Sequence, residues 1–436
     1  ADLAISISSS RPPDPPEQAP SLDRTRTTTL DIATNFLYTG SDPIQTGVTE
    51  ETIEAKRAAV IRGRVLDRKS RPLSGVDISI LNHPELGQTV SRGDGWFELA
   101  VNGGGVLTVG YAKSGYQGAH RQTHVPWHEI VVMPDVVLIE PDTLSTRIDL
   151  SSDVMQVARA SSISDNHGTR QATLFFPPGT LAEIVMSDGS FLPSDLLEVR
   201  ATEFTVGENG PLSMPAELPP TSAYTYCVAL TVDEAVNAGA AQVRFNQGVP
   251  FYVENFLEFP AGINVPLGYY SPFEGKWIAS DSGRVISLLN VSEGVAELDV
   301  DGSGLPADSE ALATLEISVA ERQKLAELYP PGQSLWRVLI PHFSSWDLNW
   351  GVSPPPNAVA AFVQEYLPWL VEEPCLTVGS QIECQTQILG ESIPIAGTPY
   401  SLNYRSDRVK GAKFANTVTV KVSDATVPDS LMRFDV

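Results

Sequence analysis

The sequence predicts an all-β protein made of tandem β-sandwich domains followed by a β-rich C-terminal segment. Two observations support this fold class. The chain has 436 residues, which is more than one hydrophobic core usually serves, so we expect several domains. Its 33 glycines and 34 prolines separate short runs rich in valine, isoleucine, threonine and tyrosine, and this pattern favours strands joined by turns.

The charge of the chain excludes one class of partner. Lysine and arginine total 29 against 53 aspartates and glutamates, which gives a net charge of −24. Such a surface repels phosphate backbones and anionic lipids, so we expect no nucleic-acid partner. The apolar run at residues 130–139 is short and is interrupted by Pro134 and Asp135, so no membrane span is predicted.

Five parts follow one another along the chain. Residues 1–57 are rich in proline, serine and threonine, which predicts a loosely ordered lead-in. Alternating runs between turn signals such as RPLSG predict a small sandwich over residues 58–140, which we expect to fold alone because its strands are local. Runs such as ATLFF and RVISLLNV predict a larger β-sandwich region over residues 141–350. A proline-rich linker, residues 351–374, then precedes residues 375–436.

Both sandwich regions carry patterns of known families. The runs GRVLD, RPLSGVDISI, DGWFELAV and LTVGYAKSGY resemble the carboxypeptidase regulatory, or transthyretin-like, domain. The matching positions are Gly75, Asp94, Gly95, Phe97, Gly115 and Tyr116. Such domains are mostly spacers or binding modules, so this resemblance implies a fold and no activity. In the larger region, FFPPGTL, GYYSPFEGKW and HFSSW resemble the β-sandwich shared by ankyrins and netrin receptors.

One segment of the larger region is a candidate for self-cleavage. Certain members of the sandwich family just named are cut within HFS, which this chain has at residues 342–344. The resemblance implies that the Ser344 hydroxyl attacks the Phe343 carbonyl, that His342 takes the proton or holds the strained peptide, and that water hydrolyses the resulting ester. The alternative is that these residues simply belong to the last strand. We find no other catalytic motif and otherwise predict no enzyme activity.

An acidic loop is a candidate calcium site. In DVDGSGLPADSE, Asp299 stands at position one of a calcium loop, Asp301 at three, Ser303 at five, Gly304 at six and Glu310 at twelve. The run before it reads as a strand, so no helix-loop-helix is formed. The run after it, ALATLEISVAERQKLAELY, is amphipathic and predicts a helix. The alternative to calcium is a solvated acidic turn.

Three histidines are spaced four apart. His120, His124 and His128 would share one face of a helix or strand, a spacing that suits metal ligands. A proline between the last two breaks a helix, and no cysteine or carboxylate cluster accompanies them. The alternative, a polar outer face of a strand, is favoured.

The three cysteines do not form a disulfide framework. Cys375 and Cys384 could close a small loop in an oxidising compartment, or they could be separate thiols. Cys227 lies within the apolar run TYCVAL, which predicts a core thiol and not a nucleophile.

The run LGESIPIAGTPYSLNYRSDR, residues 389–408, alternates polar and apolar residues around a Gly-Thr-Pro turn and predicts a β-hairpin. The same run resembles the plug that opens the YD-repeat shell of Rhs proteins, insecticidal Tc toxins and teneurins. We therefore name residues 375–436 the plug. The YD repeats themselves do not occur in this sequence, so the resemblance implies the N-terminal portion of a bacterial YD-repeat polypeptide.

This resemblance implies a non-catalytic function. The chain would seal and present a YD-repeat shell of the toxin-delivery or cell-contact type, secreted or at the cell surface. Its expected partners are the downstream shell and cell-surface or toxin-complex proteins, and calcium is the only cofactor predicted. The alternative is a free-standing surface adhesin that binds protein or glycan through its sandwiches.

Overall fold

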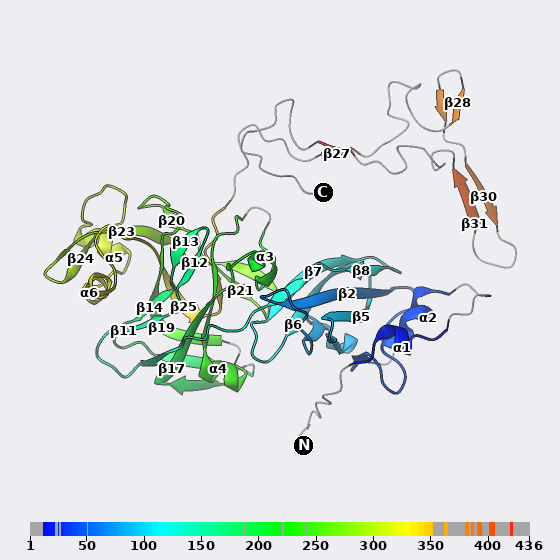
Figure 1. Ribbon diagram of the computed structural model, residues 1–436, viewed down its shortest axis with the longest axis horizontal. Coiled ribbons are helices and arrows are strands. Elements are labelled where there is room, and N and C mark those ends of the chain that lie inside the picture. The colour runs from blue at the N-terminus through cyan, green and yellow to red at the C-terminus, as the bar shows by residue number, and fades with distance from the viewer. Residues whose placement is uncertain are drawn as a thin grey trace. The chain divides into compact units, whose positions relative to one another are not determined.

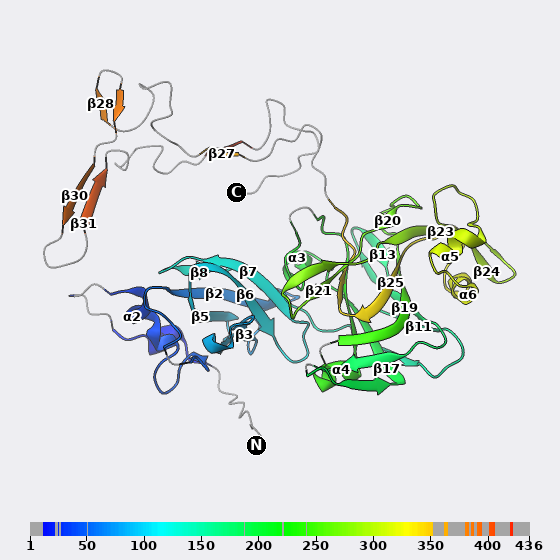
Figure 2. The ribbon, with the colours of Figure 1, turned by 180° about the vertical axis from the view of Figure 1, so that it is seen from behind.

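We describe the protein from a computed structural model (Figures 1 and 2). It describes residues 12–21, 25, 28–49, 51–186, 188–219, 222–240 and 242–351, together with six short strands between 362 and 421. The chain forms two compact units, residues 1–351 and 352–436. Strands dominate the described residues of the chain, so the predicted all-β fold is confirmed.

The first body of unit 1 is a small sandwich of two sheets, which we call the module (blue to cyan in Figure 1). One sheet has the strand order β1-β4-β3-β6-β7, and in the other β2 pairs with β5, β8 and β9. Strand β2 is antiparallel to β5 but parallel to β8 and β9. The strands are β1 Gln45–Thr46, β2 Ala58–Asp67, β3 Asp77–Ile80, β4 Gln88–Val90, β5 Trp96–Asn102, β6 Gly105–Ala112, β7 Ala119–Val125, β8 Ile130–Val132 and β9 Val136–Leu138.

Turn chemistry fixes the turn that connects β4 in one sheet to β5 in the other. Gly95 has a φ of 80°, a left-handed conformation, and a Cβ at this position would lie 2.5 Å from the Val65 carbonyl oxygen. The Asp94 carboxylate accepts a hydrogen bond from the Trp96 amide at 3.0 Å. The Asp-Gly pair therefore serves the backbone of this turn.

The lead-in was expected to be loosely ordered, but residues 28–46 fold onto the module. They include helices α2 Leu30–Thr34 and η1 Asn35–Leu37, while α1 Pro15–Gln18 precedes them and η2 Pro84–Leu86 lies within the module. Leu37 and Ile44 are buried against Val60 and Ala100 of the module. The physical reason is that β2 begins with apolar residues on both of its faces, so its outer face also needs a cover.

The second body of unit 1 is the large sandwich (green to yellow in Figure 1). Its two sheets have the orders β10-β17-β18-β26-β21-β22 and β11-β14-β19-β25-β23-β20, and β15, β16 and β24 extend the second sheet. A core that includes Phe176, Phe251, Trp336 and Trp346 draws residues from both sheets. The strands are β10 Thr146–Asp149, β11 Gln156–Arg159, β12 Ile163–Asp165, β13 Gly168–Arg170, β14 Thr173–Phe176, β15 Ala182–Val185, β16 Phe191–Ser194, β17 Leu196–Glu203, β18 Cys227–Val232, β19 Gln242–Glu254, β20 Asn264–Val265, β21 Gly268–Ser271, β22 Lys276–Ala279, β23 Gly283–Ser292, β24 Val295–Asp299, β25 Ser334–Phe343 and β26 Ser345–Asp347.

The helical run after the acidic loop forms two helices where the sequence predicted one. These are α5 Ser309–Thr314 and α6 Val319–Leu328, while α3 Gly210–Ser213 and α4 Asp233–Ala238 lie elsewhere in the sandwich. The break occurs because Glu316 has a φ of 53° and Ser318 forms a capping box with Glu321. Leu325 of α6 is buried in a second core together with residues of β23 and β24.

Unit 2 consists of three antiparallel strand pairs among its described residues. They are β27 Phe362–Gln364 with β32 Thr419–Lys421, β28 Ser380–Ile382 with β29 Gln385–Gln387, and β30 Gly390–Pro394 with β31 Ser401–Arg405. The last pair is a hairpin within the plug. Ile393 stands opposite Leu402, and the two side chains are 41% and 48% exposed. This hairpin therefore presents apolar side chains to its surroundings.

Candidate functional site

The module and the large sandwich meet at a junction with a shared core. Seven buried residues form one apolar cluster there, and three of them come from the module. They are Leu66, Val137 and Ile139 of the module and Phe204, Met214, Cys227 and Ala229 of the sandwich. Cys227 is a buried free cysteine, and burial raises the pKa of its thiol, as fits a core thiol. β2 and β9 thus bring module residues into a core shared with the sandwich, and independent folding of the module stays a prediction.

A buried arginine attaches the module to the sandwich in one half of the junction. Arg121, on β7, is 7% exposed, and its guanidinium donates to the carbonyl oxygens of Leu212 at 2.6 Å and Met214 at 3.0 Å. Beside it, His120 Nδ1 lies 2.7 Å from the Tyr270 hydroxyl, and the His120 amide donates to the Pro215 carbonyl at 2.7 Å. These contacts attach strand β7 to the large sandwich by direct polar bonds.

A cavity of about 530 Å³ lies in this half of the junction. Its lining is mainly apolar and includes Ala119, Leu230, Val243, Tyr269 and Phe343, together with Ser344. Ser344 is therefore one of the residues that line a cavity between the module and the sandwich. The sequence analysis singled out Ser344 but did not predict that it shares a cavity with module residues such as Ala119.

The candidate cleavage segment lies where the chain changes sheets. Strand β25 ends at Phe343 in the nine-stranded sheet, and β26 begins at Ser345 in the six-stranded sheet. Burial lowers the pKa of His342 to about 4, so its imidazole is neutral at neutral pH. However, His342 Nδ1 and the Ser344 hydroxyl are both buried without a hydrogen-bond partner in the described part of the chain. The serine is thus not hydrogen-bonded to its proposed base, and self-cleavage stays a prediction.

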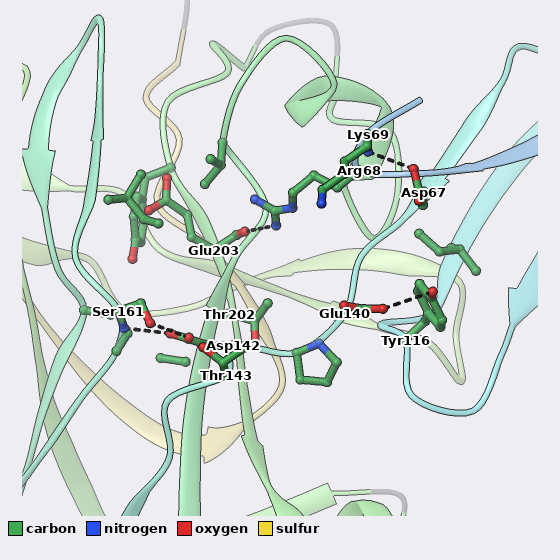
Figure 3. A pocket seen from close by; sticks show the side chains of 18 of the residues that line it. Asp67, Arg68, Lys69, Tyr116, Glu140, Asp142, Thr143, Ser161, Thr202 and Glu203 are labelled. Atoms are coloured by element: carbon green, nitrogen blue, oxygen red, sulfur yellow. Dashed lines mark hydrogen bonds between the residues drawn. The ribbon is translucent and has the colours of Figure 1, made fainter. Parts of the chain in front are cut away.

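The other half of the junction holds a cavity of about 310 Å³ (Figure 3), which we call the polar cavity because seven charged residues are among those that line it. Residues 67–69, Arg71, Tyr116, Leu138 and 140–142 line one side, and sandwich residues that include 201–203 of β17 line the other. Asn209 of the sandwich holds the 67–71 turn, because its side-chain amide donates to the Arg68 carbonyl at 3.1 Å and the Ser70 hydroxyl at 2.7 Å. The cavity wall is therefore fixed from both bodies.

Four carboxylates line this polar cavity, and each already has a partner. Asp67 accepts from Arg71 Nε at 2.7 Å, and Glu140 accepts from the Tyr116 hydroxyl at 3.2 Å. The Asp142 carboxylate accepts from the amide and the hydroxyl of Ser161, at 2.7 and 2.6 Å. Glu203 accepts from Arg170 Nε at 2.8 Å. The acidic groups of the cavity are thus neutralised or hydrogen-bonded within the protein.

Arg68 differs from these groups. Figure 3 shows its side chain reaching across the cavity to β17, where Nη2 donates to the Glu203 backbone carbonyl at 2.7 Å. Among the described residues, no carboxylate lies within ion-pair distance of its guanidinium. Burial lowers the pKa of Arg68, although Glu203 and Asp142 act in the opposite direction from farther away. The sequence analysis missed Arg68, since its RKSRP run reads only as a turn.

The acidic loop forms a turn whose backbone amides donate hydrogen bonds to the Asp299 carboxylate. Asp299 is 4% exposed, and its carboxylate accepts hydrogen bonds from the amides of Asp301, Gly302 and Gly304 at 3.1, 2.8 and 2.9 Å. Glu310 lies in the first turn of α5. No group of three or more histidine, cysteine, aspartate or glutamate side chains that could hold a metal occurs within the described ranges. Calcium binding at this loop stays a prediction.

The three histidines lie in different surroundings. His120 and His124 lie on β7, and His120 pairs with Tyr270 at the junction. His128 lies beyond the strand, with a φ of 59°. Cys375 and Cys384, the candidate disulfide, lie outside the described residues.

The residues of the two-sheet module match a known domain family. Residues 53–138 match the family described as the teneurin TTR-like domain. The chain is 35% identical over 115 residues to teneurin-3 of Mus musculus, which covers 26% of this chain and 4% of that protein. It is 42% identical over 88 residues to teneurin-m of Drosophila melanogaster, which covers 20% of this chain and 3% of that protein. The chain thus spans only a few per cent of the length of these relatives.

Similarity to solved structures is low. A 3-chlorocatechol 1,2-dioxygenase from Rhodococcus opacus 1CP aligns with a TM-score of 0.19 and 13% identity, over 22% of this chain and 64% of that chain. These values are too low to support a functional inference. Among the described residues, no helix is long and apolar enough to cross a membrane.

Proposed function

We propose that this chain is the non-catalytic N-terminal and plug portion of a secreted or cell-surface YD-repeat polypeptide, of the toxin-delivery or cell-contact type. The module and the sandwich act as a stalk, and the plug hairpin pairs with the shell wall. The observation that supports this most is the match of residues 53–138 to the teneurin TTR-like domain. The likeness of residues 389–408 to a YD-shell plug adds to it.

The plug hairpin offers a surface for such pairing. The exposed Ile393 and Leu402 form one apolar cross-strand pair, and a two-stranded hairpin is marginally stable in water by itself. Docking onto the shell would cover this pair and extend the hairpin by further strand pairing. Ile395, the other apolar residue of the predicted seal, lies outside the described residues.

Co-expression of the full chain with the YD-repeat polypeptide of the same gene or operon tests this function. We expect the two to purify together and residues 375–436 to become resistant to trypsin. The double variant Ile393→Asp and Ile395→Asp should restore trypsin cleavage within the plug while residues 58–350 stay folded. A control is Val154→Asp, which adds one negative charge at a 62% exposed residue of unit 1, where the double variant adds two in the plug. Failure to co-purify, together with a sharp cooperative melt of the isolated plug, would refute the proposal.

A second candidate function is that of a surface adhesin. One edge of the module favours it, because Trp127, Ile130 and Val132 are 55%, 55% and 62% exposed. Ile130 and Val132 belong to β8, the last strand of its sheet. Exposed apolar groups at a sheet edge suit a protein partner. Binding of the chain to cells, abolished by Trp127→Ala without any YD-repeat polypeptide present, would favour the adhesin.

A further inference from the structure

We propose that the polar cavity at the junction binds a sugar that bears a carboxylate, with the Arg68 guanidinium as the anchor for that carboxylate. This site goes beyond the proposed function and does not depend on a shell. It rests on three features of the cavity: an unpaired cation, carboxylates that are already engaged, and hydroxyl groups around them.

The first feature is the missing partner of Arg68. Arg68 is half-buried, and the fully buried arginines show how the protein satisfies a guanidinium that it removes from solvent. Arg92, Arg170 and Arg337 each meet a carboxylate, and Arg121 donates to three carbonyl oxygens. Arg68 makes one hydrogen bond, to the Glu203 carbonyl, within the part of the chain that the structure describes. A partly buried cation with N–H groups that no described group of the protein accepts from is one that an anionic ligand would satisfy.

The second feature decides the charge of the ligand. Arg68, Lys69 and Arg71 line the cavity together with four carboxylates. Arg71 is paired with Asp67, so Arg68 and Lys69 are the cations left for a ligand. A dianion such as phosphate would meet the repulsion of the carboxylates, and the net charge of −24 disfavours polyanions further. A single carboxylate on an uncharged body carries half the charge of a dianion and therefore meets less of this repulsion.

The third feature decides the body of the ligand. The hydroxyls of Tyr116 and Ser161 lie beside the carboxylates of Glu140 and Asp142, so donors and acceptors alternate along the wall (Figure 3). Sugar hydroxyls donate and accept in the same way. The cavity volume of about 310 Å³ lies at the small end of ligand pockets, which suits one sugar ring. The structure therefore points to a uronic acid or a similar acidic monosaccharide unit.

Calorimetry with the full chain tests this site. The probes are glucuronate, its uncharged methyl ester, inorganic phosphate and the tripeptide acid acetyl-Gly-Gly-Gly. We expect glucuronate to bind at least about tenfold more tightly than the ester or phosphate, because neither of these two offers a carboxylate to Arg68. Arg68→Gln should weaken glucuronate about tenfold or more. Arg147→Gln removes the same charge from an exposed position on β10 and should bind like the wild type.

The outcomes separate the parts of the proposal. Equal binding of glucuronate by the wild type and Arg68→Gln, with unchanged melting temperatures, would overturn the site. Absence of binding by every probe would overturn it as well. Binding of the tripeptide acid but not of glucuronate, with the same dependence on Arg68, would overturn the assignment to a sugar.

Discussion

The two halves of the junction use an arginine of the module in opposite ways. Arg121 is buried and donates to three backbone carbonyls, next to an apolar cavity. Arg68 is half-buried, donates to one carbonyl and lines a polar cavity. The two guanidinium groups differ in how many of their N–H groups find an acceptor. Arg121 donates to three carbonyl oxygens of the protein, whereas Arg68 donates to one and has further N–H groups that a ligand could accept from. One half of the junction is thus built for attachment and the other for a ligand.

The largest expected effect is that of Arg121→Met. This change leaves the carbonyls of Leu212 and Met214 without their buried donor and should lower the free energy of unfolding by about 3 kcal/mol. Denaturant unfolding measures it. Arg147→Met, at an exposed position, should change the stability by less than about 0.5 kcal/mol. Equal effects of the two substitutions would contradict the structural role of Arg121.

A somewhat smaller effect is expected on the outer side of the module. Leu37→Ala removes apolar contacts with Val60 and Ala100 and should cost about 2 kcal/mol in unfolding free energy. This test shows whether the module has a second fixed surface away from the junction. Ile32→Ala, at a residue that is 55% exposed, is the matched control and should be nearly silent. If Leu37→Ala left the free energy of unfolding unchanged, residues 28–46 would be a loosely ordered lead-in, as the sequence predicted.

Protonation of His342 makes the stability of the protein depend on pH. Its pKa falls from 6.5 to about 4 on folding, so the unfolded chain holds more protons between these values and stability falls as the pH falls through that window. Asp347 opposes this, since burial raises its pKa to about 6. His342→Gln should therefore lose less stability than the wild type between pH 7 and 4, by about 1 kcal/mol after allowance for partial exposure. Urea unfolding at both pH values measures this, and parallel losses would contradict it.

The smallest expected effect on stability is that of Arg68→Gln. Its single hydrogen bond to the Glu203 carbonyl can be replaced by the glutamine amide, so the free energy of unfolding should fall by less than about 1 kcal/mol. Denaturant unfolding beside Arg121→Met compares the two arginines directly. If Arg68→Gln lowered the free energy of unfolding as much as Arg121→Met, both halves of the junction would serve to stabilise the fold.

Local patterns predicted the fold class but not the junction. Turn pairs such as Asp94 and Gly95 act on their own neighbours, so the strands around them could be inferred from the sequence. The order of residues 28–46 was missed, although the apolar start of β2 on both faces is a signal that something covers it. Arg68 and Arg121 were missed because their partners lie more than 90 residues away. The sequence placed His342 and Ser344 close together but could not tell that neither has a hydrogen-bond partner.

Hydrogen exchange of the full chain in increasing denaturant tests most directly whether the module and the large sandwich form one body. The shared cluster of Leu66, Ile139 and Phe204 predicts that the amides of β2 in the module and β18 in the sandwich lose protection at the same denaturant concentration. Loss of protection in β18 while β2 stays protected would contradict this, and the module would then be an independent domain that merely rests on the sandwich.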